Sequence, residues 1–263
     1  MNSSQIDRPR SLEDLYELIE RDRVAAAALA EIAFANDAAL AISSISEISS
    51  VACAKVLADT QVASAKALID AEVSVARLSA GAGVAVAEYK RHVQEHPQSV
   101  PLTTVAGMVG QICDKHVEEI QLGGRQSIET IERDAQLAIA KLKEIGNAAI
   151  QEIRGLEHAI SAQIEQDAAM AAERLRAFRE KPHTPEEVMA EAENAARKVE
   201  AAASQAISQL HHGVDEAIRN IQATTDEACR QILAAAEAAC KRLTLAQEKA
   251  LGTIRTVVEF HME

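Results

Sequence analysis

Aromatic side chains are nearly absent from this chain of 263 residues, which contains no Trp, two Tyr and three Phe. An ordinary globular core needs aromatic and branched aliphatic side chains, because these bury enough apolar area to offset the entropy of the chain. The hydrophobic fraction is nevertheless 48%, with only 10 Gly and 5 Pro. Since much of that fraction is alanine, the composition favours long helices with closely spaced backbones over a compact globule.

Basic residues are also few, since 27 Lys and Arg stand against 40 Asp and Glu, for a net charge of −13. Such a chain has no excess positive charge to neutralise phosphates, so we expect no nucleic-acid partner. Its four cysteines form no CxxC pair, a pattern typical of free thiols in a reducing cytoplasm.

Signals for export and membrane insertion are missing as well. The N-terminal residues lack the basic and then apolar segment of a secretory signal. The longest stretch without a formal charge, residues 97–113, contains two prolines and several polar residues, so we expect no transmembrane segment. We therefore expect a cytoplasmic protein.

The sequence contains no Gly-rich phosphate loop, nucleophile elbow, HExxH motif or EF-hand loop. These motifs supply the backbone geometry or the ligand spacing on which common enzymatic sites depend. We therefore predict no catalytic residue, no cofactor and no enzymatic activity.

An eleven-residue repeat runs through the chain in place of such motifs. In the C-terminal third, one column is always branched and aliphatic, and a second column, seven positions later, is always alanine. The members are Val188, Val199, Leu210, Ile221, Ile232, Leu243 and Ile254, with Ala195, Ala206, Ala217, Ala228, Ala239 and Ala250. Eleven residues complete three turns at about 3.67 residues per turn, so each column stays on one face of a helix, as in hendecad coiled coils.

Two further ladders with the same spacing occupy the rest of the chain, and each ladder has seven members. They are Leu18, Leu29, Leu40, Val51, Val62, Val73 and Val84, then Val109, Ile120, Ile131, Leu142, Ile153, Ile164 and Leu175. Equal ladders predict three helices of near-equal length.

Prolines fall in the gaps between the ladders, at Pro97 and Pro182, where they should end helices. Thr184 to Glu187 then forms a helix-start signal, with a capping residue followed by Pro and Glu. The predicted elements are a flexible N-terminus 1–10, a helix 11–96, a turn 97–101, a helix 102–181 with a kink near 123–124, a turn 182–184 and a helix 185–261.

These elements predict an all-α fold, an elongated antiparallel up-down-up three-helix bundle with hendecad coiled-coil periodicity, forming one domain. If the prolines mark the centres of the hairpins, two residues lie opposite each other across the first hairpin when their numbers add up to 193. Across the second hairpin the numbers add up to 363. The resulting layers include Val51/Leu142/Ile221 and Val62/Ile131/Ile232. In a competing architecture the hairpins open, and neighbouring subunits supply the facing ladders.

The first helix is apolar or small on nearly all sides, as in residues 38–46. Such a helix needs covering on more than one side, whereas every helix of a three-helix bundle leaves one face to water. We therefore expect self-association through this helix. The alternative is that Ala and Ser are simply tolerated on a solvated face.

Histidines gather at the predicted first turn and at the C-terminal end. His92 and His96 are spaced i, i+4 with Glu88 one turn earlier, and His261 falls at the same level. This spacing is able to hold zinc or another transition metal, and Cys113 and His116 lie near the same turn. Solvated histidines at a helix end are the alternative interpretation, so we assign no metal site and keep His92, His96 and His261 as candidates.

Three functional hypotheses follow. The first is a self-assembling structural coiled-coil protein that forms a rod-like oligomer or cytoplasmic filament without catalysis. The second is an amphipathic coat on a lipid, membrane or storage-granule surface, although the acidic, aromatic-poor composition disfavours it. The third is a metal-binding or enzymatic protein that uses the histidine-rich end.

Overall fold

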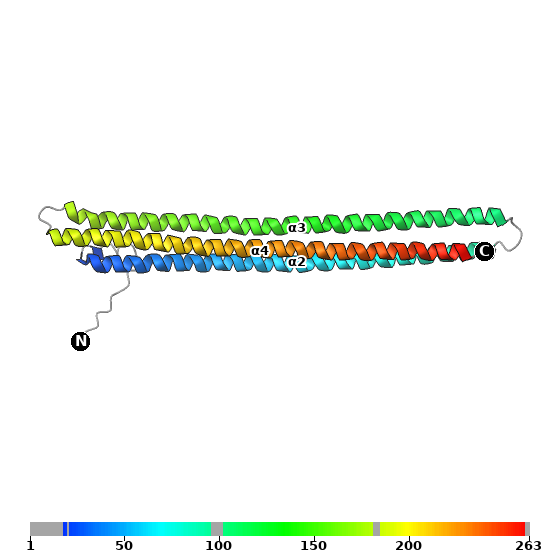
Figure 1. Cartoon of the computed structure of the whole chain (residues 1–263), viewed down its shortest axis with the longest axis horizontal. Coiled ribbons are helices and arrows are strands. Elements are labelled where there is room, and N and C mark those ends of the chain that lie inside the picture. Colours follow the sequence, from blue (N-terminus) through cyan, green and yellow to red (C-terminus); the bar gives the residue numbers. More distant parts are fainter. Residues whose placement is uncertain (1–17, 20, 96–101, 181–184, 261–263) are drawn as a thin grey trace, which may run out of the picture. The chain divides into compact units, whose positions relative to one another are not determined.

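The computed structural model describes residues 18–19, 21–95, 102–180 and 185–260 of the chain. Its helices are α2 (Arg23–Glu95), α3 (Leu102–Arg176) and α4 (Glu186–Phe260), with a short 3-10 helix, η1 (Ala177–Glu180), after α3 (Figure 1). No strand occurs in these ranges. The predicted all-α fold with three long helices is confirmed, while the expected flexible N-terminus and both turns lie outside the described residues.

Polar groups mark the start of two helices. The backbone N–H groups of Val24 and Ala25 donate to Asp22 Oδ1, at 3.2 and 3.0 Å, so Asp22 caps α2. The sequence predicted a helix from residue 11, and residues 18, 19 and 21 are helical but separated from α2 by Asp22. Helix α4 begins directly after Pro185, as expected, and its first turn holds two acidic residues, whose negative charge interacts favourably with the helix dipole. The predicted capping residue Thr184 lies outside the described residues.

The chain divides into two compact units, and each takes one segment from every helix. Unit 1 comprises residues 1–54 and 146–223, and unit 2 comprises residues 55–145 and 224–263. In unit 2, Asp59 and Lys66 of α2 pair with Lys141 and Asp134 of α3, at 3.0 and 2.6 Å. From one ion pair to the next, the residue number rises on α2 and falls on α3, so these two segments are antiparallel.

Unit 1 has the same up-down-up order. Arg176 at the end of α3 pairs with Glu200 of α4 at 2.7 Å, and Glu157 pairs with His211 at 3.6 Å, so α3 and α4 are antiparallel. Ser49 of α2 donates to the carbonyl of Ala217 in α4 at 3.3 Å. Each unit is therefore a three-helix bundle segment with its own core.

The predicted ladders of α3 and α4 form these cores. Every rung of α3 from Ile120 to Leu175 and every rung of α4 from Val199 to Ile254 is buried, as are all six alanines of the second α4 column. The side chain of Val109 lies outside the described side chains. Small and branched residues thus alternate along α4, which lets the helices approach closely while the branched rungs fill the layers between them.

The ladder predicted for the first helix is wrong over most of its length, because its rungs from Leu40 to Val84, the outward ladder of α2, are exposed, while Leu18 and Leu29 are half-buried against the core. Val51 and Val62 are 62% and 69% exposed. The buried column lies five residues further on and repeats with the same spacing of eleven. Its rungs are Phe34, Ile45, Val56, Ala67, Leu78 and Tyr89. Since α2 has apolar residues in several columns of the repeat, periodicity alone could not distinguish the inner column from the outer one.

The predicted register is wrong as well. It placed residue 127 opposite Lys66, whereas Lys66 pairs with Asp134, seven residues away and about two helical turns. On the second hairpin it placed residue 206 opposite Glu157, whose partner is His211. The layers Val51/Leu142/Ile221 and Val62/Ile131/Ile232 therefore do not form as drawn, because the proline midpoints do not mark the centres of the contacts.

Gly213 of α4 allows close approach between helices. A Cβ atom there would lie 2.9 Å from the β-branched side chain of Ile42 in α2. A Cβ atom at Gly124 would lie 2.5 Å from Oε1 of Gln247, but this is the end of a flexible side chain that is able to move aside. The helix α3 continues without interruption through 123–124.

Truncation of two α2 residues tests which column is buried. Ile45 is 1% exposed and Leu40 is 68% exposed. We expect Ile45→Ala to lower the free energy of unfolding by about 3 kcal/mol through lost burial and a cavity. Leu40→Ala should cost under about 0.5 kcal/mol. Chemical unfolding at low protein concentration measures both, and a larger cost for Leu40→Ala would reverse the assignment.

Candidate interaction surface

Helix α2 carries most of the large apolar side chains that the described residues expose to solvent. Thirteen such residues are exposed, nine on α2 and two on each of the other long helices. Those on α2 are Val24, Ile32, Leu40, Val51, Leu57, Val62, Ile69, Val73 and Val84. Five of these nine belong to the outward ladder and so follow one face of the helix, while the other four lie in other columns of the repeat.

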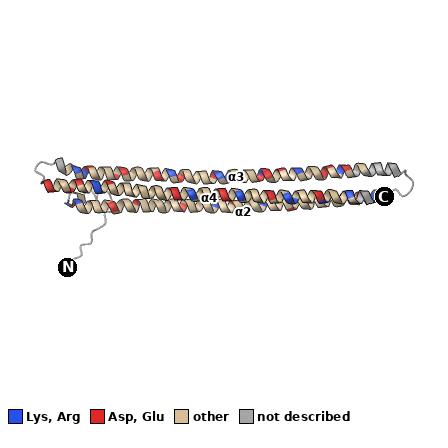
Figure 2. Ribbon diagram, in the orientation of Figure 1, with Lys and Arg blue, Asp and Glu red and all other residues tan. Residues whose placement is uncertain are grey.

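Charged residues are correspondingly sparse on α2. It has 14 Asp, Glu, Lys and Arg among 73 residues, against 20 among 75 in each of α3 and α4. Figure 2 shows long tan stretches on α2 where its neighbours carry red and blue. An 18-residue window of α2 is apolar enough to cross a membrane by length and composition, although only 33% of it is buried within the bundle. The expectation of no transmembrane segment rested on residues 97–113 and did not include this window.

In unit 2 the outward face of α2 combines the ladder with small residues. Val62, Val73 and Val84 are exposed, and exposed alanines stand between them at Ala65 and Ala76. On such a face, ridges of branched side chains alternate with grooves over the alanines. The side chains of a second helix fit into grooves of this kind.

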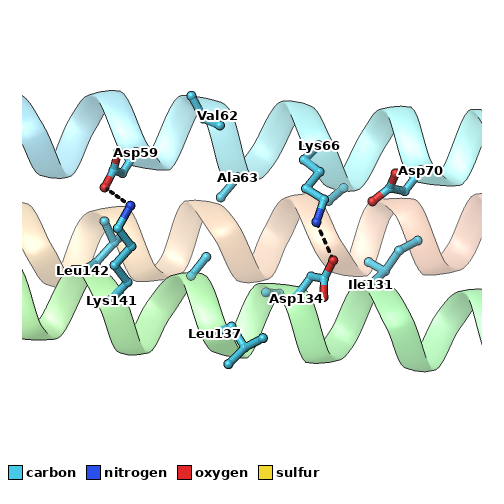
Figure 3. Close-up of a pocket in the computed structure, with 13 residues that line it drawn as sticks. Asp59, Val62, Ala63, Lys66, Asp70, Ile131, Asp134, Leu137, Lys141 and Leu142 are labelled. Atoms are coloured by element: carbon cyan, nitrogen blue, oxygen red, sulfur yellow. Dashed lines mark hydrogen bonds and ion pairs between the residues drawn. The ribbon is translucent and has the colours of Figure 1, made fainter.

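A groove lies beside this face, between α2 and α3 of unit 2, with a volume of about 260 Å³. Figure 3 shows Val62 and Leu137 at the two margins of the groove, which they help to line, while two ion pairs cross it. Alanines line it from both helices, at Ala63, Ala67, Ala135 and Ala138. Because alanine fills little space, the groove is left open between the two helices.

One of the two ion pairs that cross the groove shifts the pKa of both its groups. The hydrogen bond and charge of Lys66 lower the pKa of Asp134, and the same hydrogen bond raises the pKa of Lys66. The second pair joins Asp59 to Lys141 at 3.0 Å. Both lysine side chains remain more than half exposed, so their ammonium groups are accessible from solvent.

A sequence signal for this groove exists and was missed. Residues 59–66 read DTQVASAK and residues 134–141 read DAQLAIAK. The two segments share Asp, Gln, two Ala and Lys at equivalent positions, and Val62 corresponds to Leu137. This similarity is not part of the eleven-residue repeat, because the two segments lie on different helices.

The histidine cluster is only partly brought together. His116 of α3 lies between two carboxylates, with Nε2 3.0 Å from Glu88 of α2 and Nδ1 3.2 Å from Glu119. The hydrogen bond from His116 lowers the pKa of Glu88. His92 is half-buried, and the candidates His96 and His261 lie outside the described residues. Within the described part of the chain, no group of three or more His, Cys, Asp or Glu side chains is placed to hold a metal ion.

All four cysteines are free thiols. Burial raises the pKa of Cys113, Cys229 and Cys240, which lowers the fraction of reactive thiolate at neutral pH. Cys229 and Cys240 occupy apolar positions of the α4 repeat, so they serve packing in this structure.

The lowered pKa of Asp134 predicts how the stability of the protein depends on pH in acid. The stabilising contribution of this carboxylate should be fully present above the unfolded pKa of about 3.9 and be lost as pH falls through its lower folded pKa. The difference in melting temperature between the wild type and Asp134→Asn should therefore be constant between about pH 7 and 5 and shrink below about pH 4. Thermal melts followed by circular dichroism measure it, and a difference unchanged in acid would contradict the assignment.

No protein-family model matches the chain. No curated protein matches it either. Among solved structures, a computationally designed three-helix bundle is similar, with a TM-score of 0.59 and 14% sequence identity over 94% of this chain and 99% of that chain. At this identity the likeness concerns the fold alone, which is that of a three-helix bundle.

Proposed function

We propose that the protein is a structural, self-assembling helical protein without catalytic activity, whose copies join through the outward face of α2. The observation that carries this proposal is the outward ladder of α2, which holds five of the nine large apolar side chains that α2 exposes, among thirteen exposed in the described residues. The faces of α3 and α4 that point to solvent carry many more charges. Among the three described long helices, α2 therefore contributes most to a surface suited to a further helix.

The arrangement of these apolar residues favours their burial against a second copy. Isolated apolar residues on a surface are ordinary, whereas an extended apolar patch marks an interaction site. Burial of apolar area contributes about 25 cal/mol per Å², and the alanines between the ladder rungs allow two helix backbones to approach closely. Since the face repeats every eleven residues, it favours an extended contact, as in a rod-like oligomer or a cytoplasmic filament.

Sedimentation velocity and negative-stain microscopy across protein concentration test self-association. We expect wild-type assemblies to grow with concentration, and we expect Leu40→Glu with Val51→Glu to shift the protein at least tenfold in concentration toward the monomer, since charge on this face opposes its burial. The matched control is Leu233→Glu, at an exposed position of α4, which should leave assembly within about twofold. A wild-type chain that is monomeric at all concentrations would refute the proposal.

The alternative function is a coat on a lipid, membrane or storage-granule surface. Its specific support is the apolar window of α2, which is long enough to lie in an interface. Against it stand the net charge of −13 and the scarcity of aromatic anchors.

Flotation with liposomes separates the two functions. With vesicles of neutral lipid and vesicles containing anionic lipid, a self-assembling bundle should remain in the unbound fraction. Recovery of most of the protein with either kind of vesicle would favour the coat function, and the loss of that binding in Leu40→Glu with Val51→Glu would assign it to α2.

A further inference from the structure

We infer that the α2–α3 face of unit 2 is a self-recognition site, which pairs with the same face of a second copy of this chain about a two-fold axis. This inference rests on the proposed function and specifies the symmetry and the selectivity of one contact. The face consists of the groove, the ion pairs that cross it, and the exposed Val62 and Leu137 (Figure 3).

The face has an internal two-fold symmetry. The segments 59–66 and 134–141 carry the same pattern, Asp-x-Gln-aliphatic-Ala-x-Ala-Lys, and lie antiparallel across the groove. The Asp of each segment therefore meets the Lys of the other, as the distances of 3.0 and 2.6 Å show. Two charges depart from this symmetry. Asp70 lines the groove on α2 and has Ile145 at the equivalent position of α3, and Arg133 pairs with Asp134 at 3.5 Å and has Ala58 at the equivalent position of α2.

Four charges stand at the corners of this face and alternate in sign. Asp59 and Lys66 lie seven residues apart on α2, about 10 Å along the helix, and Asp134 and Lys141 have the same spacing on α3. Each negative corner thus has a positive neighbour both along its own helix and across the groove.

An alternating square of charges is complementary to itself. When a second copy is turned over so that the two faces meet, each Asp comes to lie over a Lys, whether the two-fold axis runs along the helices or across them. The groups retain capacity for a second partner, because an ammonium has three donors and a carboxylate about four acceptor positions. Electrostatic complementarity of this kind selects the partner and its orientation.

The apolar part of the face fits the same partner. Val62 and Leu137 are 69% and 63% exposed and occupy equivalent positions on the two sides of the groove. The alanines of the groove leave room for a branched side chain from a facing copy. A second copy therefore supplies both the charges and the apolar side chains that the face needs.

Charge reversal tests the recognition directly. The variant carries Asp59→Lys, Lys66→Asp, Asp134→Lys and Lys141→Asp, which keeps both internal ion pairs but inverts every corner. We expect this chain to assemble with itself within about threefold of the wild type. In mixtures of wild-type and reversed chains with different tags, mixed assemblies should be at least tenfold rarer than like pairs, because like charges then meet. This discrimination should weaken in 1 M salt, where screening is strong.

A pair of single substitutions keeps the test decisive if the reversed chain folds poorly. Leu137→Gln should weaken self-association at least tenfold, whereas Leu245→Gln, at a 65% exposed leucine of α4, should change it by less than about twofold. Both substitutions are on the surface, so circular dichroism melts should match the wild type within a few degrees.

The outcomes separate this inference from the proposed function. If the wild-type chain does not self-associate, both fail. If it does, three results would each overturn this inference alone: free mixing of folded reversed and wild-type chains, loss of self-assembly in a folded reversed chain, or equal effects of the two leucine substitutions.

Discussion

The structure depends on the agreement between an eleven-residue sequence repeat and the turn of the α-helix. Because three turns take nearly eleven residues, a column of the repeat keeps its direction along the helix. In α4 the branched column and the alanine column both stay buried in unit 1 and in unit 2. A chain with almost no aromatic residues thereby obtains a core from many thin layers, each of which uses only a few medium-sized side chains.

The sequence was sufficient to predict those parts of the fold that this agreement determines. The ladders of α3 and α4 alternate with charged faces, so the rungs of Ile153 and Leu210 could be assigned to the core. In α2, by contrast, Val51 and Ile45 belong to columns that are equally regular, and only the packing of the other helices determines which is buried. The register needed pairs such as Lys66 with Asp134, which depend on three-dimensional contacts and not on the position of the prolines.

Helix α2 divides its side chains in an unusual way. Its inner surface in unit 2 includes small residues such as Ala67, Ala71 and Ala82, while branched residues such as Val73 point to solvent. The small inner residues allow α2 to approach the neighbouring helices closely. The larger branched side chains are then left on the outer surface, where their apolar area stays exposed to solvent. Ala67 also lines the groove between α2 and α3. The groove was not predicted because the repeated segments 59–66 and 134–141 lie on separate helices.

The repeat also acts as a unit of length. Removal or insertion of eleven residues at matching levels of all three helices would change each by about 16 Å and leave every later residue on its original face. An insertion of one or two residues in a single helix would instead rotate all later rungs of that helix away from the core. Length and surface chemistry are thus separable properties of this chain, and the helices are free to vary in steps of eleven residues while the same faces are retained.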